Sequence, residues 1–298
     1  LALCLAAACV GCGNKDQDEA VSNEDFPVTE GGATVKGAPQ RIVCLSPAIY
    51  EALEALGATA SVVGVGSGVN ADSSLPRVGS SALPELDAVI KLSPDLVLTS
   101  GALDTADADS LALQEIPVAV LPTAGRYDLL VAYYTQISSL VSGRQTGAAN
   151  ARRTAERIQG SVQQITDKVK NETTVTACLV LGMDTAAGGD TLAGDLLQLA
   201  GAQNVAGQTS GYTFTADELA AAGPEVLFCP PTLVSTLAAG SAYAGIPAVK
   251  NGRIYAIEPY LLETPGDSMV KAVAAMAQSL HPDLFPDETP GQETSPVA

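Results

Sequence analysis

The two halves of this chain repeat one pattern, and that repeat limits the folds it can adopt. Each half has an apolar run, a helix-like segment, a second helix-like segment carrying an acid, and a further apolar run after a proline. Asp87 precedes Pro94 by the same spacing at which Asp217 precedes Pro224. An Ile-Pro pair then opens another segment in each half. The repeat predicts two similar α/β lobes, and such lobes leave a cleft between them where a ligand can bind.

Short apolar runs alternate with segments of helical period in both halves. This alternation predicts Rossmann-like lobes with mainly parallel sheets covered by helices. Residues 42–45 predict a buried strand, after which Ser46 can cap a helix that has Pro47 at its first position. The other strands are expected at residues 96–99, 118–121, 175–181, 226–228 and 253–257.

Residues 143–171 differ from both halves because they form one long polar segment. Apolar positions recur there at the three- and four-residue spacing of a helix, and the helix would be about 40 Å long. We expect it to join a lobe of residues 37–142 to a lobe of residues 172–286. A helix that packs within one domain is the alternative.

The chain is strongly acidic, with a net charge of −18 over 298 residues. This charge argues against a nucleic-acid partner, whose phosphates require lysine and arginine. Tryptophan is absent and there are four phenylalanines, so an aromatic pocket has to draw on the eight tyrosines.

The first residues are expected to direct export rather than to fold. Residues 1–12 are apolar and too short to span a bilayer, and we interpret them as a signal-peptide remnant. Val10, Gly11 and Cys12 resemble a bacterial lipobox, so Cys12 is the predicted lipid-bearing residue and the protein is expected outside the cytoplasm on the cell membrane; Cys9 is the alternative acceptor. Residues 13–36 are expected to be a flexible tether, near the end of which residues 34–35 can begin a short edge strand, and residues 287–298 a disordered tail.

Three cysteines lie in the body of the chain, each within a strand-like apolar run. We expect Cys44, Cys178 and Cys229 to be buried as small hydrophobic side chains. Cys178 and Cys229 fall on strands that would be neighbours, which leaves a disulfide between them open.

The sequence offers little machinery for catalysis. Its one histidine, His281, comes at the expected end of the last helix, where histidines commonly interact with the helix dipole. Neither a GxSxG nucleophile motif nor a phosphate-binding loop is present. We therefore expect no catalytic residue, no metal ligands and no resident cofactor. A ligand that itself carries iron or cobalt is compatible with this, and haem held by a tyrosine stays open.

Polar and aromatic side chains recur at loops that should follow the carboxyl ends of strands, where open α/β sheets bind ligands. Arg126 is the strong cation among them, which suits a weakly charged chelate or a corrinoid better than an anionic siderophore. The candidate ligand-binding residues are Tyr50, Asn70, Arg126, Tyr127, Asp184, Tyr212, Phe214, Tyr243 and Tyr260, with Asp104 and Met183 beside them.

Several short motifs follow one another at regular places over residues 37–285. They comprise residues 41–47, 56–57, 75–79 and 86–98, and more loosely residues 217–227 and 252–255. In this order the chain resembles the substrate-binding proteins of ABC importers for iron–siderophores, haem and cobalamin. The resemblance implies two rigid lobes joined by a single helix, with little closure on binding, and capture of a ligand rather than catalysis.

The resemblance also implies partners. A loaded protein of this family docks on a permease dimer that carries an ATPase, and an acid in each lobe pairs with arginines of the permease. Asp87 and Asp217 occupy those positions here, with Glu85 and Glu218 as substitutes. Two rival functions stay open. A Rossmann-type metallocluster enzyme would need cysteine or histidine ligands near the cleft, and a tethered sensor would present its ligand to a receptor.

Overall fold

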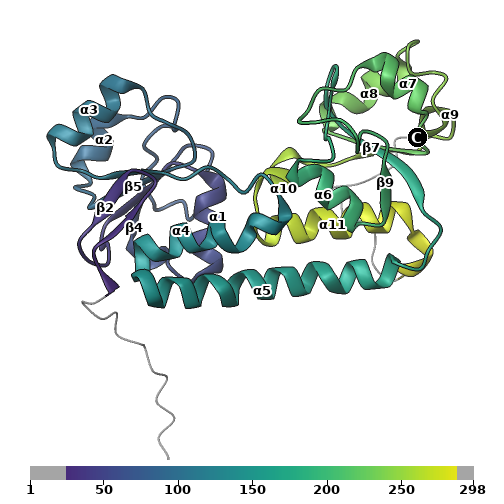
Figure 1. The fold of residues 1–298 in the computed structure, drawn as a ribbon. Helices are drawn as coiled ribbons and strands as arrows, with labels where there is room; N and C mark the ends of the chain where they lie inside the picture. Colours follow the sequence, from purple (N-terminus) through teal and green to yellow (C-terminus); the bar gives the residue numbers. More distant parts are fainter. Residues whose placement is uncertain (1–24, 287–298) are drawn as a thin grey trace, which may run out of the picture.

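The computed structural model describes residues 25–286, which form two α/β lobes joined by the long helix α5 (Arg144–Val169), as Figure 1 shows. The first lobe holds a 4-stranded sheet in which every pairing is parallel. Its strands, in spatial order, are β4 (Val62–Val65), β3 (Ile42–Cys44), β5 (Leu96–Thr99) and β6 (Val118–Val120). Its helices are α1 (Pro47–Ala55), α2 (Leu86–Lys91), α3 (Thr105–Leu113) and α4 (Leu130–Ser142), with the short 3₁₀ turns η2 (Thr59–Ser61) and η3 (Tyr127–Leu129).

The second lobe repeats this topology. Its strands are β7 (Val175–Gly182), β8 (Thr185–Ala186), β9 (Ala202–Asn204), β10 (Val226–Cys229) and β11 (Ile254–Ala256). Parallel pairing gives the order β9, β7, β10, β11, which matches the order β4, β3, β5, β6, and β8 adds an antiparallel edge to β7. Its helices are α6 (Leu192–Leu199), α7 (Ala216–Ala222), α8 (Pro231–Ala239), α9 (Pro247–Lys250), α10 (Pro259–Glu263) and α11 (Asp267–Leu280), followed by η4 (Pro282–Leu284). The predicted α/β fold with mainly parallel sheets is confirmed.

One difference concerns the expected tether. Strands β1 (Val28–Glu30) and β2 (Ala33–Val35) form an antiparallel hairpin inside the range 13–36, and the hairpin contacts α4 and β6. Successive side chains of a strand point to opposite faces, and Val28, Ala33 and Val35 are the ones buried against the first lobe. Residues 25–36 therefore belong to that lobe. The rest of the expected tether, residues 1–12 with Cys12, and the expected tail lie outside the described residues.

Helix α5 spans both lobes. It packs against α4 on one side of the molecule and against α6 and α11 on the other, which excludes its placement within one domain. Its start is capped by a distant residue because Gly143 has no side chain to offer. Asp25 accepts hydrogen bonds from the Gln145 backbone at 2.7 Å and the Thr146 hydroxyl at 2.8 Å, and these bonds hold the pKa of Asp25 below its ordinary value.

We predict that the Asp25 cap stabilises the protein in a pH-dependent way. Because its folded-state pKa is lowered, the contribution is present above the unfolded-state pKa and is lost as the pH falls through the folded-state pKa. Asp25→Ala should lower the urea midpoint at neutral pH, and the difference from wild type should shrink toward about pH 3. Asp25→Asn keeps a hydrogen-bond acceptor at this position, so its urea midpoint should fall less than that of Asp25→Ala. An equal effect of Asp25→Ala at both pH values would contradict the assignment.

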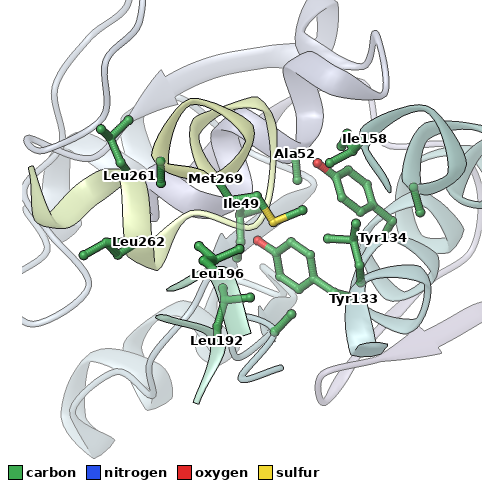
Figure 2. Packing of buried hydrophobic residues seen from close by; sticks show 14 of the residues in the cluster. Ile49, Ala52, Tyr133, Tyr134, Ile158, Leu192, Leu196, Leu261, Leu262 and Met269 are labelled. Carbon is green, nitrogen blue, oxygen red and sulfur yellow. The ribbon is translucent and has the colours of Figure 1, made fainter. Parts of the chain in front are cut away.

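One hydrophobic core passes from lobe to lobe. Ile49 of α1 and Tyr133 of α4 belong to the same buried cluster as Leu196 of α6, Leu262 of α10 and Met269 of α11, and Figure 2 shows these side chains converging. Each lobe also has a smaller core of its own, which includes Val97 in the first lobe and Leu227 in the second. The shared cluster in addition packs the two lobes against each other.

The three cysteines are buried and free, and the disulfide left open between Cys178 and Cys229 is not formed. The register of β7 and β10 sets Cys178 opposite Leu227 rather than opposite Cys229. Burial raises the pKa of each thiol to about 12. These thiols are therefore neutral packing groups at ordinary pH.

Candidate ligand-binding cleft

A cavity of about 790 Å³ lies between the lobes. Its walls come from α1 and the loop after β4 in the first lobe and from α10 and α11 in the second, with α5 contributing Arg157. Three predicted ligand-binding residues, Tyr50, Asn70 and Tyr260, line it from both lobes. Its volume lies within the range of small-molecule and cofactor sites, about 300–1,000 Å³.

Local sequence places the first-lobe wall. The Ser46 hydroxyl caps α1 by accepting from the Ile49 backbone, and Pro47 takes the first helical position as the sequence predicts. This directs the first turn of α1, with Tyr50, toward the cleft. Burial, and then the charge of Glu54, raise the pKa of Tyr50, so its hydroxyl is a neutral donor.

The loop after β4 is held by Arg77. Its guanidinium donates to the backbone carbonyls of Val69 and Ala71, the latter at 2.9 Å. The exposed Asn70 lies between these two carbonyls in the chain and is therefore presented by a fixed loop.

The second-lobe wall presents Tyr260, which follows Pro259 at the start of α10 and is 49% exposed. The predicted binding residue Tyr212 does not line this cavity. It is 45% exposed and its hydroxyl is hydrogen-bonded to Thr191, the residue that caps α6. Burial, with smaller effects from Glu263 and Asp190, raises the pKa of Tyr212.

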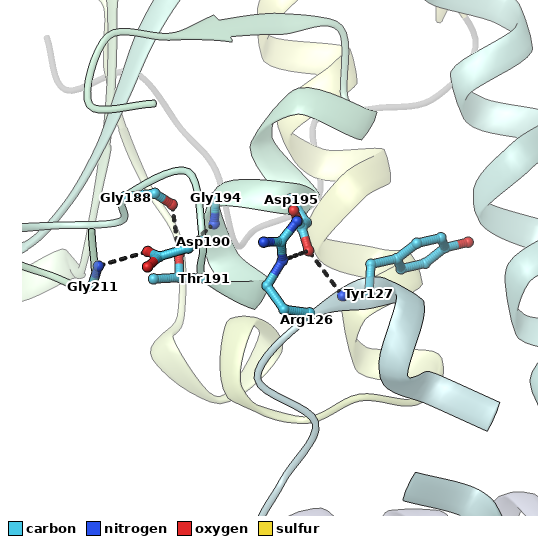
Figure 3. Close-up of polar contacts among 8 residues, drawn as sticks. All are labelled: Arg126, Tyr127, Gly188, Asp190, Thr191, Gly194, Asp195 and Gly211. Carbon is cyan, nitrogen blue, oxygen red and sulfur yellow. Dashed lines mark hydrogen bonds and ion pairs between the residues drawn. The ribbon is translucent and has the colours of Figure 1, made fainter. Parts of the chain in front are cut away.

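An aspartate of the second lobe binds the first lobe on one side of the cleft (Figure 3). Asp195, in the first turn of α6, accepts from the Arg126 Nε at 2.8 Å and from the Tyr127 backbone at 2.9 Å. The predicted binding residues Arg126 and Tyr127 thus join the lobes, and they line a separate hollow of about 330 Å³.

A glutamate of the first lobe binds the second lobe beside the cavity. Glu51 on α1 accepts from the Ser268 backbone at 2.7 Å and from its hydroxyl at 2.6 Å. Helix α11 begins after Gly266 and has no capping side chain of its own, so Glu51 caps it from the other lobe. Arg157 of α5 also pairs with Asp267 of α11 at 2.8 Å. These carboxylates, with the shared core, connect the two walls of the cleft.

We predict that these interlobe carboxylates contribute measurably to stability. Glu51→Ala leaves the Ser268 donors unpaired, and Asp195→Ala does the same for Arg126 and the Tyr127 backbone. Each change should cost about 1–3 kcal/mol in urea unfolding. Glu54→Ala, on the same helix as Glu51, is the matched control and should stay within about 0.5 kcal/mol of wild type. Equal effects at Glu51 and Glu54 would show that Glu51 does not cap α11.

Four other residues that the sequence singled out lie elsewhere. Asp184 accepts from the Ala216 backbone at 2.8 Å and so caps α7. Phe214 and Tyr243 lie in the core of the second lobe at 9% and 5% exposure, because their loops fold over β7 and β10. Asp104 caps α3.

Sequence reasoning missed several residues that line the cavity. They are Glu51, Glu54, Arg157, Asp267, Ser268 and Lys271. All lie on helices, whereas the sequence pattern points to loops that follow the ends of strands. The one available signal was Gly266 before a helix with no capping side chain, which points to a cap from elsewhere in the fold.

Asp87 and Asp217 occupy equivalent places in the two lobes. Each is exposed in the first turn of its helix, α2 or α7, and neither has a hydrogen-bond or ion-pair partner within residues 25–286. Figure 1 shows α2 and α7 on the side of the molecule away from α5. Glu218 is bound in a capping box with Thr215, and Glu85 is exposed at the start of α2.

Comparison with known proteins agrees with this architecture. The family model for periplasmic binding proteins matches residues 42–261, and the chain belongs to this family. Its members are transport binding proteins, so the chain is a substrate-binding component of an ABC transporter and not an enzyme.

Individual relatives are distant but cover most of the chain. An ABC transporter substrate-binding lipoprotein, YvrC of Bacillus subtilis, is 28% identical, with 95% of this chain and 96% of that protein covered. A cobalamin-binding protein of Halobacterium salinarum is 28% identical over 89% of this chain and 76% of its own length. The structure of the haem-binding protein HutB of Vibrio cholerae has a TM-score of 0.71 at 22% identity, covering 82% of this chain and 99% of that one.

Cys44, Cys178 and Cys229 sit inside strands with raised thiol pKa values, and residues 25–286 contain no group of three potential metal-binding side chains. No helix in this part of the chain is both long and apolar enough to cross a membrane.

Proposed function

We propose that this protein captures an iron–siderophore, haem or a corrinoid in the interlobe cleft and delivers it to an ABC permease dimer with its ATPase. The observation that carries the proposal is the cavity between the lobes, to which Tyr50 and Tyr260 come from opposite sides. The names of relatives that bind cobalamin and haem support this ligand class.

In this proposal the cleft has its binding shape before the ligand arrives. The shared core and the carboxylates Glu51 and Asp195 fix the two walls before a ligand arrives, so little conformational entropy is lost on binding. Tyr260, at 49% exposure, offers a flat ring surface to a bulky chelate, whereas Tyr50 is buried to 6% exposure and presents only a small part of its side chain. A ring contact is worth about 1 kcal/mol beyond the area it buries.

We predict that Tyr50 and Tyr260 bind the ligand. Visible absorption titrations with haem, cobalamin and ferric siderophores should identify a ligand of the wild-type protein. Tyr50→Ala and Tyr260→Ala should each weaken it about fivefold to tenfold. Leu113→Ala, at an 83% exposed position on α3, is the control and should bind like wild type. If no probe binds, or the tyrosine variants bind normally, the proposed cleft is wrong.

Docking is proposed to use Asp87 and Asp217, one from each lobe. Their exposure, lack of partners and location on one side of the molecule suit contact with a two-fold permease dimer. Glu218 is less suited, because its carboxylate already binds the Thr215 backbone and hydroxyl at 2.7 and 2.8 Å.

We predict that Asp87→Lys with Asp217→Lys abolishes uptake and permease binding while ligand affinity stays unchanged, because charges at such a contact orient the partners. Glu156→Lys with Glu172→Lys adds the same charge on and just after α5, and this control should transport normally. Permease binding by wild type should weaken with salt. Normal uptake by the double variant, with Glu85 also neutralised, would exclude this docking site.

The membrane anchor is proposed to be a lipid on Cys12, and the lipoprotein name of YvrC supports it. When the protein is made with its natural leader in a bacterial host, Cys12→Ser should release it from the membrane fraction and remove the acyl mass. Cys9→Ser should leave both unchanged. Acyl mass retained in the Cys12→Ser protein would assign the lipid to another residue.

A further inference from the structure

The arginines around the cleft are already engaged. Arg126 pairs with Asp195 at 2.8 Å, and Arg157 pairs with Asp267 through two contacts of 2.8 and 3.4 Å. Arg77 is bound to backbone carbonyls of its own loop. An anionic ligand would therefore have to compete with protein carboxylates and carbonyls for each of these guanidinium groups.

One of the three carboxylates that line the cavity is unmatched. Glu54 lines the cavity and has no hydrogen-bond or ion-pair partner among residues 25–286. Partial burial, and then the nearby charge of Glu51, raise the pKa of Glu54. Lys271 on α11 is the lining cation without an ion pair in this part of the chain, and it is exposed at the cavity edge. With Arg157, it faces three acids: Glu51, Glu54 and Asp267.

The second lobe is also acidic around Tyr212, outside the residues that line the cavity. Asp190 and Glu263 lie close enough to that hydroxyl for their charges to raise its pKa, after the larger effect of burial. Asp190 is also held in place, because it accepts from the Gly211 backbone at 2.6 Å.

We propose that the cleft takes a neutral or cationic chelate, and that Glu54 is the residue that discriminates against ligands carrying free carboxylates. This inference rests on the proposed function and narrows its ligand class. A ligand carboxylate beside Glu54 would meet repulsion that solvent partly screens, because Glu54 is exposed on the cavity wall. The paired arginines cannot offset this repulsion without breaking contacts between the lobes, which leaves Lys271 as the lining cation that could.

Binding should also depend on pH. The charged groups around Glu54 are Glu51 on its own helix, Arg157 on α5, and Asp267 and Lys271 on α11. A cationic ligand favours ionised Glu54, so its affinity should increase as the pH rises through the raised pKa of Glu54, and a proton should be released on binding. A neutral ligand should show a smaller dependence.

Matched probes separate ligand charge from ligand shape. Ferrioxamine B carries an amine where its N-succinyl derivative carries a carboxylate. Cyanocobalamin differs from its monocarboxylic acid by one amide, and haem dimethyl ester differs from haem by its masked propionates. Calorimetric titration of the whole protein should show that, on the scaffold it binds, the member without the carboxylate binds at least about tenfold tighter.

Variants at Glu54 complete the test. Glu54→Gln should reduce the preference and Glu54→Lys should reverse it, while Glu156→Gln, at an exposed carboxylate on α5, should leave it unchanged. Equal or tighter binding of the carboxylate member by wild type, or an unchanged preference in Glu54→Gln, would overturn the inference and leave the proposed function standing. Failure of all three scaffolds to bind would overturn both.

Discussion

The packing of the two lobes against each other is the constraint on which the rest of this structure depends. Ile49 and Tyr133 of the first lobe share one buried cluster with Leu196 and Met269 of the second. Carboxylates then complete the contact in both directions, with Glu51 capping α11 and Asp195 binding Arg126. Because the join is a packed core rather than a flexible strand hinge, the cleft has its shape before a ligand enters it.

This join also determines the chemistry of the cleft. The arginines that could have bound an anionic ligand hold the lobes together instead, through Asp195 and Asp267. Because these contacts use the arginines, they leave the cleft acidic. The ligand charge that we propose follows from this use of the arginines in lobe packing. Tyr260 remains as the exposed ring surface that a neutral or cationic chelate can contact, and Tyr50 adds the small part of its side chain that is exposed.

Much of the fold could be predicted from the sequence, because the repeat, the alternation of apolar runs and the period of residues 143–171 are local patterns. Tyr50, Asn70 and Tyr260 could be placed at the cleft since they follow strand ends. The pairing of Arg126 with Asp195 could not, because the partners lie in different lobes and no sequence pattern links them. The short strand expected at residues 34–35 is β2, but its partner β1 was missed because it is short and follows a polar stretch.

The central claim is that the cleft is preformed, and an interlobe distance measured with and without ligand tests it most directly. Spin labels at Asp87→Cys and Asp217→Cys report this distance by pulsed electron resonance in a protein that is made to begin after Cys12. Cys44, Cys178 and Cys229 are buried with thiol pKa values of about 12, so they should not react. The structure predicts one narrow distance distribution that ligand leaves unchanged. A broad distribution, or a shift of several ångströms on binding, would contradict it.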